Sequence, residues 1–399
     1  MRARPAGHRR CLPHHVRIAY VTETYPPELN GVAATVARIV EGLRARGNLL
    51  HLVRPRQPDD AAYDTDDEWR VAGLPLPMYR SLRIGLPVFA GLRRRWRTVR
   101  PDVVHIATEG PLGWAALRAG RALGVPVTSD LRTNFDLYSA YYGLGFLSQI
   151  VNRYLRQFHN ATDRTFVPTR ELAAQLGATG FRNLTVIGRG VDALRFSPRH
   201  RSDALRASWG ALPHDPVALY VGRLAAEKNL PLVFRAFAAM RWREPRARLV
   251  VVGDGPLRKS LVNNAADGIV FAGEKRGSEL AAYYASADVF VFPSLTETFG
   301  NVTLEALASG LVVVAYDTAA ASVHIEDGIS GWLAGPGDEN AFVDRACRAL
   351  TLAASSGAMR AAARRSAEAA SWDAIVGQYE DGLRGCRGAA ASDVPAYAA

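Results

Sequence analysis

The 399-residue chain has few cysteines and no long apolar run, and each absence excludes a class of protein. Its three cysteines, Cys11, Cys347 and Cys386, are far apart and in no metal-binding spacing, which argues against a disulfide framework or a zinc site. No apolar run reaches the roughly 18 residues of a membrane-spanning helix. No apolar segment follows the basic residues 1–15, so we expect a disordered tail or a misplaced start there rather than a signal peptide.

Two further absences concern partners. The chain has no G-x-G-x-x-G dinucleotide fingerprint, which argues against an oxidoreductase. Its net charge of +11 comes mostly from arginine and suits anionic partners such as nucleotides, anionic lipid or nucleic acid. No helix-turn-helix, zinc-finger or RNP-like motif accompanies this charge, so we expect no nucleic-acid partner. The length and the 48% apolar content are enough for two α/β domains.

Two carboxylates, Glu297 and Glu305, stand with seven residues between them, flanked by two apolar runs. The runs, residues 289–292 and 311–315, are typical of buried parallel strands, and residues 300–309 of a helix between them. In an open parallel sheet, ligands lie outside the carboxyl ends of the strands, where the first amides of a helix suit a phosphate. A lone pair of carboxylates, however, is more often a surface loop residue and a solvated helix residue.

The whole stretch resembles the E-x7-E signature of the retaining GT-B glycosyltransferases of family 4, which include sucrose synthases and phosphatidylinositol mannosyltransferases. Thr-Phe-Gly inside the stretch and Leu-Glu-Ala-Leu-Ala-Ser-Gly at its end make the resemblance specific, and it extends over residues 16–383. It implies that Glu297 lies by the donor sugar, that Glu305 holds the nucleotide ribose, and that the amides between them face sugar and phosphate. The donor-binding residues implied here are Phe299, Gly300, Asn301, Val302 and Glu305.

Basic residues follow another expected strand, residues 217–221. Gly222, Arg223 and Lys228 come directly after it. An isolated basic pair is usually solvated, but at a strand end it can neutralise a leaving diphosphate. The resemblance implies that role for Arg223 and Lys228.

Three more positions follow strands in the same way. Gly31 comes after the expected strand at residues 16–21 and opens a helical pattern, which is an anion-binding arrangement. The resemblance places Gly31 and Gly253 against the donor and Glu274 at the edge of the base.

A loop at residues 129–135 departs from the family, because Arg132 stands where many relatives have a histidine against the donor sugar. Arginine is always charged and cannot act as a base, so the donor sugar and the acceptor geometry stay open, and Arg132 is as well explained as a surface charge.

The predicted fold is therefore α/β and GT-B, with two Rossmann-like doubly wound domains that face each other across a cleft. The predicted boundaries are a basic tail at residues 1–15, an acceptor-side domain at 16–190, a nucleotide-sugar domain at 191–371, a helix crossing back at 372–386 and a disordered tail at 387–399. The Gly-rich linker lies around residues 188–192.

The predicted function is retaining transfer of a hexose, mannose or glucose, from a GDP- or UDP-sugar to a lipid or glycan hydroxyl. The mechanism implied by the resemblance is front-face attack without a metal or a cofactor, and the catalytic residues are Glu297, Arg223, Lys228 and Arg132. The alternatives are a GT-B sugar-nucleotide epimerase and a transferase with a polysaccharide or small soluble acceptor. A phosphorylase of the glycogen type would need a pyridoxal lysine and a much longer chain. The oligomeric state is not predicted.

A membrane contact is a further expectation. Residues 79–100 contain seven arginines and no acid, and Val88, Phe89, Leu92, Trp96 and Val99 give them an apolar stripe. Such a helix can lie on anionic lipid, or it can bury its stripe on the sheet and leave solvated arginines outside. The aromatic stretch at residues 138–146 is a second candidate contact. We expect a cytoplasmic protein, with a peripheral position on the inner face of the membrane as the consequence of such binding.

Overall fold

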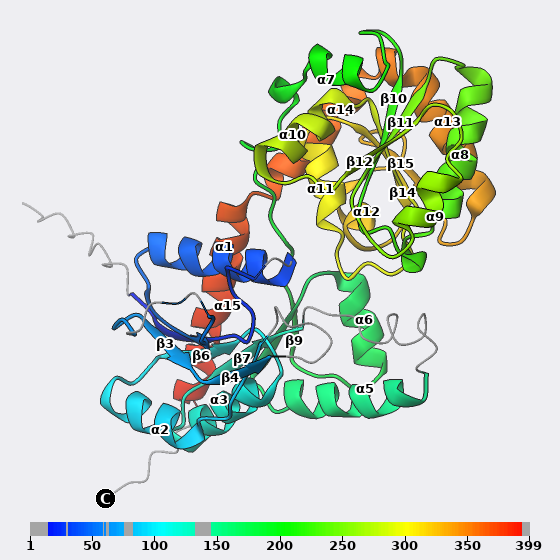
Figure 1. Ribbon diagram of the computed structural model, residues 1–399. Helices are drawn as coiled ribbons and strands as arrows, with labels where there is room; N and C mark the ends of the chain where they lie inside the picture. Colours follow the sequence, from blue (N-terminus) through cyan, green and yellow to red (C-terminus); the bar gives the residue numbers. More distant parts are fainter. Residues whose placement is uncertain are drawn as a thin grey trace, which may run out of the picture. The chain divides into compact units, whose positions relative to one another are not determined.

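The computed structural model describes residues 15–28, 31–58, 60, 64–75, 83–131 and 145–392 (Figure 1). The chain divides into two compact units. Unit 1 comprises Met1–Asp130, Phe158–Thr165 and Tyr379–Ala399, and unit 2 comprises Leu131–Gln157 and Phe166–Gln378. The predicted domain boundaries, including both tails, stay predictions. None of the helices in the described ranges is both long and apolar enough to cross a membrane.

The first sheet has seven strands in the order β3-β2-β1-β6-β7-β8-β9. The pairs of β1 with β2 and β6, of β2 with β3, and of β6 with β7 are parallel. A separate antiparallel pair joins β4 and β5. The strands are β1 Arg17–Val21, β2 Leu49–Pro55, β3 Glu68–Val71, β4 Gly73–Pro75, β5 Arg83–Gly85, β6 Val103–Ile106, β7 Val127–Asp130, β8 Arg164–Val167 and β9 Leu184–Val186.

The helices of unit 1 pack apolar faces against this sheet. α1 is Gly31–Ala45, α2 is Phe89–Thr98 and α3 is Pro111–Ala122. Leu92 and Trp96 of α2 are buried in the same apolar core as Leu112 of α3 and Val104 of β6. The apolar stripe of α2 therefore packs on the sheet, which is one of the two arrangements predicted for this segment.

The second sheet lies in unit 2 and has six strands in the order β12-β11-β10-β13-β14-β15. Every strand pairs with its neighbour in parallel. Such strands are covered on both faces, which is why they are nearly continuous runs of Val, Leu and Phe. They are β10 Val217–Val221, β11 Arg248–Val252, β12 Ile269–Gly273, β13 Val289–Phe292, β14 Val312–Tyr316 and β15 Trp332–Ala334.

Helices cover both faces of the second sheet. Figure 1 shows α8 and α13 on one side and α10, α11 and α14 on the other. The helices from α5 onward are α5 Gly145–His159, α6 Arg170–Ala178, α7 Asp203–Ser208, α8 Leu230–Arg243, α9 Arg258–Asn263, α10 Gly277–Ser286, α11 Asn301–Ala308, α12 Ala319–His324, α13 Glu339–Leu352, α14 Gly357–Ala369 and α15 Trp372–Ser392. The 3-10 turns are η1 Pro198–His200, η2 Ala226–Lys228 and η3 Ala353–Ser355.

A few expected elements differ from the structure. β3 is an edge strand that the sequence analysis does not identify, because its charged residues hide the usual alternation. The helix expected within residues 79–100 is shorter, and Val99 lies outside it with 66% of its surface exposed, so Val99 does not share the buried stripe. The final helix continues past its expected end at residue 386 as far as Ser392.

Candidate active site

The second sheet places two loops of unit 2 side by side. Its strand order changes direction between β10 and β13, because β11 and β12 lie on one side of β10, and β13 to β15 on the other. In parallel α/β sheets, ligands bind outside the carboxyl ends of the strands at such a switch point. The loop after β10 carries Arg223 and Lys228, and the loop after β13 carries Glu297.

Lys228 and Glu297 meet at this point. The ammonium of Lys228 forms an ion pair with Oε1 of Glu297, and both side chains are mostly buried, with 12% and 17% exposed. Ser294 donates its hydroxyl to the same Glu297 oxygen at 2.8 Å. The Lys228 ammonium also lies 5.9 Å from the centre of the Phe292 ring. Two segments that are distant in the sequence therefore hold one carboxylate and one cation together at the ends of β10 and β13.

Arg223 lies in the same loop but is less constrained. Its guanidinium is 3.9 Å from Oε1 of Glu227, and its side chain is 49% exposed, while that of Glu227 is 2% exposed. The hydroxyl of Thr296 donates to the backbone carbonyl of Glu227 at 3.4 Å, which ties the loop after β13 to η2. Arg223 is thus a cation whose head remains accessible beside the Lys228–Glu297 pair.

Glu305 has a different environment from Glu297. It lies in the second turn of α11 and accepts a hydrogen bond of 3.0 Å from the hydroxyl of Tyr284, a fully buried residue of α10. Burial raises the pKa of Glu305 to about 7, and the Tyr284 hydrogen bond and the charge of Arg195 oppose this rise only in part. Near neutral pH this carboxyl is therefore poised between its charged and neutral forms.

The amino end of α11 is open to a ligand because of Gly300. This residue is the N-cap of α11 and has a φ of +86°, a conformation that side chains rarely adopt. The next residues, Asn301 and Val302, provide first-turn amides, which have no partner inside the helix. The Oδ1 atom of Asn301 is buried without a hydrogen-bond partner among the described residues. The ring of Phe299, in contrast, is buried in the core, so only its backbone could contact a ligand.

Glycines let the loops after β10 and β11 approach each other closely. A Cβ on Gly253 would lie 2.0 Å from the carbonyl oxygen of Gly222. The amide of Gly222 bonds to Val252 O at 3.0 Å, and that of Gly253 to Gly273 O at 2.9 Å. Gly222 and Gly253 therefore form one continuous floor at the carboxyl ends of these strands.

Glu274 lies apart from these residues within unit 2. It follows β12, the edge strand, which is three strands away from β13 and so about 14 Å distant. Its side chain is 58% exposed and pairs with Arg276 at 2.7 Å. Gly31 is the first residue of α1 in unit 1. Arg132 and most of the aromatic stretch at residues 138–146 lie outside the described residues.

Unit 1 has its own polar strand ends. Glu23, which follows β1, accepts the amide of Leu112 in the first turn of α3 at 2.9 Å, and a Cβ on Gly110 would lie 2.1 Å from its carboxylate. The amino end of α3 is therefore filled by a side chain of the protein. Burial raises the pKa of Glu23 to about 7, and the charge of Glu109 raises it further. Burial also raises the pKa of Glu109 to about 7.

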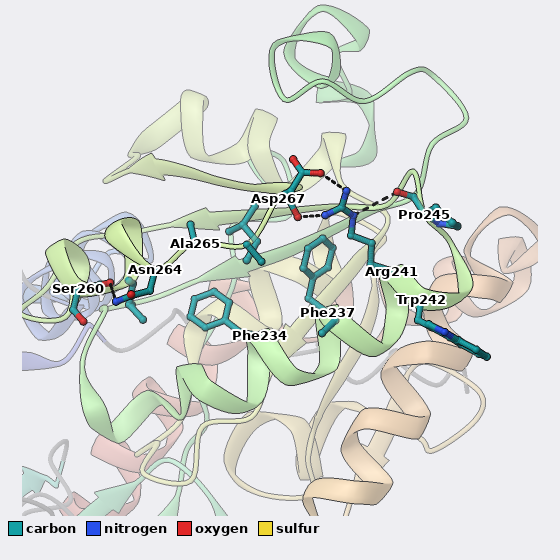
Figure 2. A pocket seen from close by; sticks show the side chains of 13 residues that line it. Phe234, Phe237, Arg241, Trp242, Pro245, Ser260, Asn264, Ala265 and Asp267 are labelled. Carbon is teal, nitrogen blue, oxygen red and sulfur yellow. Dashed lines mark hydrogen bonds and ion pairs between the residues drawn. The ribbon is translucent and has the colours of Figure 1, made fainter.

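A cavity of about 630 Å³ lies elsewhere on unit 2 (Figure 2). It is lined by the last turns of α8, by α9 and by Ile269, the first residue of β12. Figure 2 shows Arg241 bonded to Asp267 along one side, and the rings of Phe234 and Phe237 in its wall. Since α8 begins near the carboxyl end of β10 and runs away from it, this cavity lies at the opposite end of the sheet from Glu297.

Sequence reasoning missed three of these partners. Ser294 belongs to the Pro-Ser pair before Glu297. Its hydroxyl is so close in sequence to a predicted site carboxylate that it could have been predicted as a hydrogen-bond partner. Glu227 precedes Lys228 directly and was also within the motif. Tyr284 was not detectable, because it comes from a helix 21 residues before Glu305 and only the packing of α10 on α11 brings it there.

Two family models match this chain, and it has relatives among known proteins. Residues 29–195 match the model of Glycosyltransferase Family 4, and residues 215–351 match that of Glycosyl transferases group 1. The GDP-mannose-dependent alpha-mannosyltransferase of Mycobacterium tuberculosis is 35% identical over 381 residues, which are 93% of this chain and 98% of that protein. The alpha-monoglucosyldiacylglycerol synthase of Streptococcus pneumoniae is 28% identical, over 80% of this chain and 75% of that protein.

The fold has relatives among solved structures. Sucrose-phosphate synthase from Thermosynechococcus elongatus superposes with a TM-score of 0.73 at 19% identity, covering 94% of this chain and all of that one. This likeness concerns the fold, which is GT-B with two Rossmann-like halves. From the two family matches and the mannosyltransferase relatives, we conclude that the chain belongs to glycosyltransferase family 4 and is a hexosyltransferase that uses a nucleotide sugar.

Proposed function

We propose that the protein transfers mannose from GDP-mannose to a lipid hydroxyl with retention of configuration and without a metal ion. The observation that carries the reaction class is the Lys228–Glu297 ion pair at the switch point of the second sheet, beside the open amino end of α11. The choice of donor is supported by the relatives that are GDP-mannose-dependent alpha-mannosyltransferases. UDP-glucose is the second candidate, because two relatives are named alpha-monoglucosyldiacylglycerol synthase.

In this proposal the diphosphate lies against the loop after β10 and the start of α11. Arg223 and Lys228 provide two positive charges, and the amides of Asn301 and Val302 add the positive end of the helix dipole. Charge on the leaving diphosphate grows in the transition state, so fixed cations stabilise the transition state more than the bound donor. These groups together replace the divalent cation that other transferases use.

Glu297 then has two tasks. It holds the Lys228 ammonium in place before the donor binds, and Ser294 fixes the orientation of its carboxylate. It also lies where the loop after β13 meets the donor sugar. Transfer follows a front-face path: the acceptor hydroxyl attacks on the side from which the diphosphate leaves, and the leaving phosphate oxygen takes its proton. The protein contributes position and charge rather than a general base.

Glu305 and the glycine floor bind the nucleoside. A ribose has two vicinal hydroxyls, and the ionised carboxylate of Glu305 would accept from them while Tyr284 holds its other oxygen. Gly222 and Gly253 let the backbone approach the nucleotide closely. Glu274 is three strands from β13, at the far edge of this surface, and would contact only the base of the nucleotide.

The acceptor assignment rests on the diacylglycerol relatives and on a basic face of unit 1. Leu92 and Trp96 anchor α2 in the core, so its arginines point outward, and α3 packs beside α2 with two more. The residues of this basic face are Arg94, Arg95, Arg97, Arg100, Arg118 and Arg121, all of them exposed. Basic residues near anionic lipid contribute roughly 1 kcal/mol each, so this face would hold the enzyme on a membrane that contains its acceptor.

Two experiments test the proposal. A thermal-stabilisation and hydrolysis screen of nucleotide sugars should single out GDP-mannose, because a bound donor stabilises the fold by mass action. A preference for a UDP-sugar would reject mannose while keeping transfer, whereas interconversion of the sugar without an acceptor would indicate an epimerase.

For the membrane, vesicle co-sedimentation should require anionic lipid and weaken as salt rises. It should also decrease when Arg94, Arg95, Arg97 and Arg100 become Gln. Equal recovery with neutral and anionic vesicles would favour a soluble or polysaccharide acceptor.

A further inference from the structure

Unit 2 has a second group of basic residues at the amino end of its sheet, opposite to Glu297. Asp288, just before β13, is their shared acid. Its Oδ1 accepts from Arg201 at 3.1 Å, and its Oδ2 accepts from Arg206 at 3.1 Å. The backbone amide of Val217 also donates to Oδ2, at 2.9 Å. Both oxygens of Asp288 are therefore occupied before any further arginine is considered.

Arg360 of α14 is that further arginine. Its Nε donates to Gly310 O at 2.7 Å, but its Nη1 is 3.9 Å from Asp288, beyond hydrogen-bond distance. Within the described ranges, its two terminal nitrogens donate to no acceptor. Burial lowers the pKa of Arg360, Asp288 opposes this, and the charges of Arg201 and Arg206 lower it further. The side chain of Arg360 is 26% exposed, so its guanidinium lies in an electropositive place that solvent or a ligand can reach.

Arg360 lines a cavity of about 530 Å³ that is open to solvent. Its lining consists of Pro198, Arg201, Gly310, Arg360, Ala361 and Arg364. Arg364 donates hydrogen bonds to Glu368 at 2.7 Å, to Phe196 O at 2.6 Å and to two other backbone carbonyls. Arg364 is thus occupied, whereas the terminal nitrogens of Arg360 have no hydrogen-bond acceptor within the described ranges. Arg201, which bonds Asp288 and two backbone carbonyls, adds charge beside Arg360.

We propose that this cavity binds a phosphate group of a small soluble ligand, held by the terminal nitrogens of Arg360 with Arg201 beside it. The planar fork of a guanidinium matches two oxygens of a phosphate, and one acid shared among several arginines leaves excess positive charge in the cavity. An anion there would supply the acceptors that Arg360 lacks and would offset the repulsion among the arginines.

The cavity lies at the carboxyl end of α11. Arg360 holds the carbonyl of Gly310, and Arg364 holds that of Ala308, the last residue of α11. The amino end of the same helix carries Gly300. A ligand at Arg360 would therefore contact the side chains that fix the far end of the helix to which the donor site is attached.

The test is calorimetric titration of the full chain with inorganic pyrophosphate. Pyrophosphate would also bind the proposed donor site, so the titration uses the double variant Arg223→Ala, Lys228→Ala. One binding event should remain in this background, and Arg360→Gln should weaken it about 10- to 100-fold, the loss expected for hydrogen bonds to a charged group. The matched control is Arg365→Gln, an exposed arginine of the same helix that does not line the cavity.

The outcomes separate this site from the donor site. No binding in the double variant would overturn the inference and leave the proposed transfer intact. Equal losses in Arg360→Gln and Arg365→Gln would also overturn it, since they would indicate general attraction. Arg201→Gln provides a second variant if Arg360→Gln does not fold. A lipid headgroup offers the same chemistry: binding of phosphatidate vesicles, sensitive to Arg360→Gln, without binding of pyrophosphate would reject a soluble ligand.

Discussion

Replacing Glu305 by Gln should change both the stability of the protein and its affinity for nucleotide, with opposite signs. The wild-type carboxyl is partly accessible and bonded to Tyr284, and burial raises its pKa from 4.5 to about 7. A raised carboxyl pKa means that the folded state favours the protonated form. The contribution of the protonated Glu305 to the free energy of unfolding is therefore fully present below pH 4.5. This contribution is lost as the pH rises through 7.

The size of this loss follows from the two pKa values. Ionisation in the folded state costs about 3 kcal/mol at pH 8.5 and about 1 kcal/mol at pH 5.5, relative to an ordinary carboxyl. The difference of about 2 kcal/mol is an upper value, because residual solvent access weakens it, and we expect about 1–2 kcal/mol. Glutamine keeps an acceptor for Tyr284 but carries no charge. The melting temperature of Glu305→Gln should therefore rise relative to wild type as the pH increases from 5.5 to 8.5.

The affinity for nucleotide should change in the opposite direction to the stability. If the ionised carboxylate accepts from the ribose, wild-type affinity for GDP should increase about tenfold from pH 6 to pH 8, as the charged fraction rises from about 0.1 to about 0.9. Glu305→Gln should lose about 1.5–3 kcal/mol of the free energy of GDP binding at pH 8. The affinity of this variant also changes with pH, because the nucleotide phosphate titrates, and that change is the baseline to subtract from the wild-type curve. Isothermal calorimetry measures both.

The exposed residue Glu339 provides the control for this pair of measurements. Its carboxylate lies 2.7 Å from Arg235 on the surface of the same unit, so Glu339→Gln should show no growing difference from wild type across this pH range. A constant difference between wild type and Glu305→Gln from pH 5.5 to 8.5 would show that Glu305 is not desolvated. Unchanged GDP affinity would show that Glu305 does not hold the ribose.

Other predictions concern the remaining site residues. Glu297→Ala should lower turnover more than melting temperature; a large drop in melting temperature with full activity of the folded fraction would make Glu297 structural. Lys228→Ala and Arg223→Ala should each lower kcat about 10²–10³-fold through lost stabilisation of leaving-group charge, measured with saturating donor. Activity should persist in EDTA, and a complete loss that Mn²⁺ restores would contradict the metal-free proposal. Arg132→His should alter the preference among donor sugars, and wild-type kinetics on every donor would place Arg132 outside the site.

The sequence was most informative where the physics is local. The strands β10, β11 and β13 are short, mostly buried apolar runs. A glycine follows β10 and β11 and a Pro-Ser pair follows β13, and the loop of the candidate site comes directly after each strand. Glu297 and Lys228 could be assigned in this way, although they are 69 residues apart. Their direct contact could not be read from either motif, because the neighbourhood of β10 and β13 is a property of strand order.

Edges and packing partners were harder to predict. β3 has two charged residues among its four and lies at the edge of its sheet, so neither alternation nor an apolar run marks it. Val99 continues the helical pattern of α2 by spacing, yet the helix ends at Thr98 and leaves it exposed. The Tyr284 hydroxyl that meets Glu305 depends on how α10 packs on α11, which no local pattern contains.

The two carboxylates of the E-x7-E stretch show why its spacing matters. Glu297 lies before α11, where the loop after β13 reaches a cation from the neighbouring strand, while Glu305 lies in the second turn of the helix against a buried tyrosine. Between them, Gly300 has a backbone conformation that frees the first amides of the helix. One residue more or less between Gly300 and Glu305 would rotate Glu305 by about 100° around α11, relative to the start of the helix, and change its position against Tyr284. The spacing thus joins a charged contact, an anion-binding helix end and a poised carboxyl in one short segment.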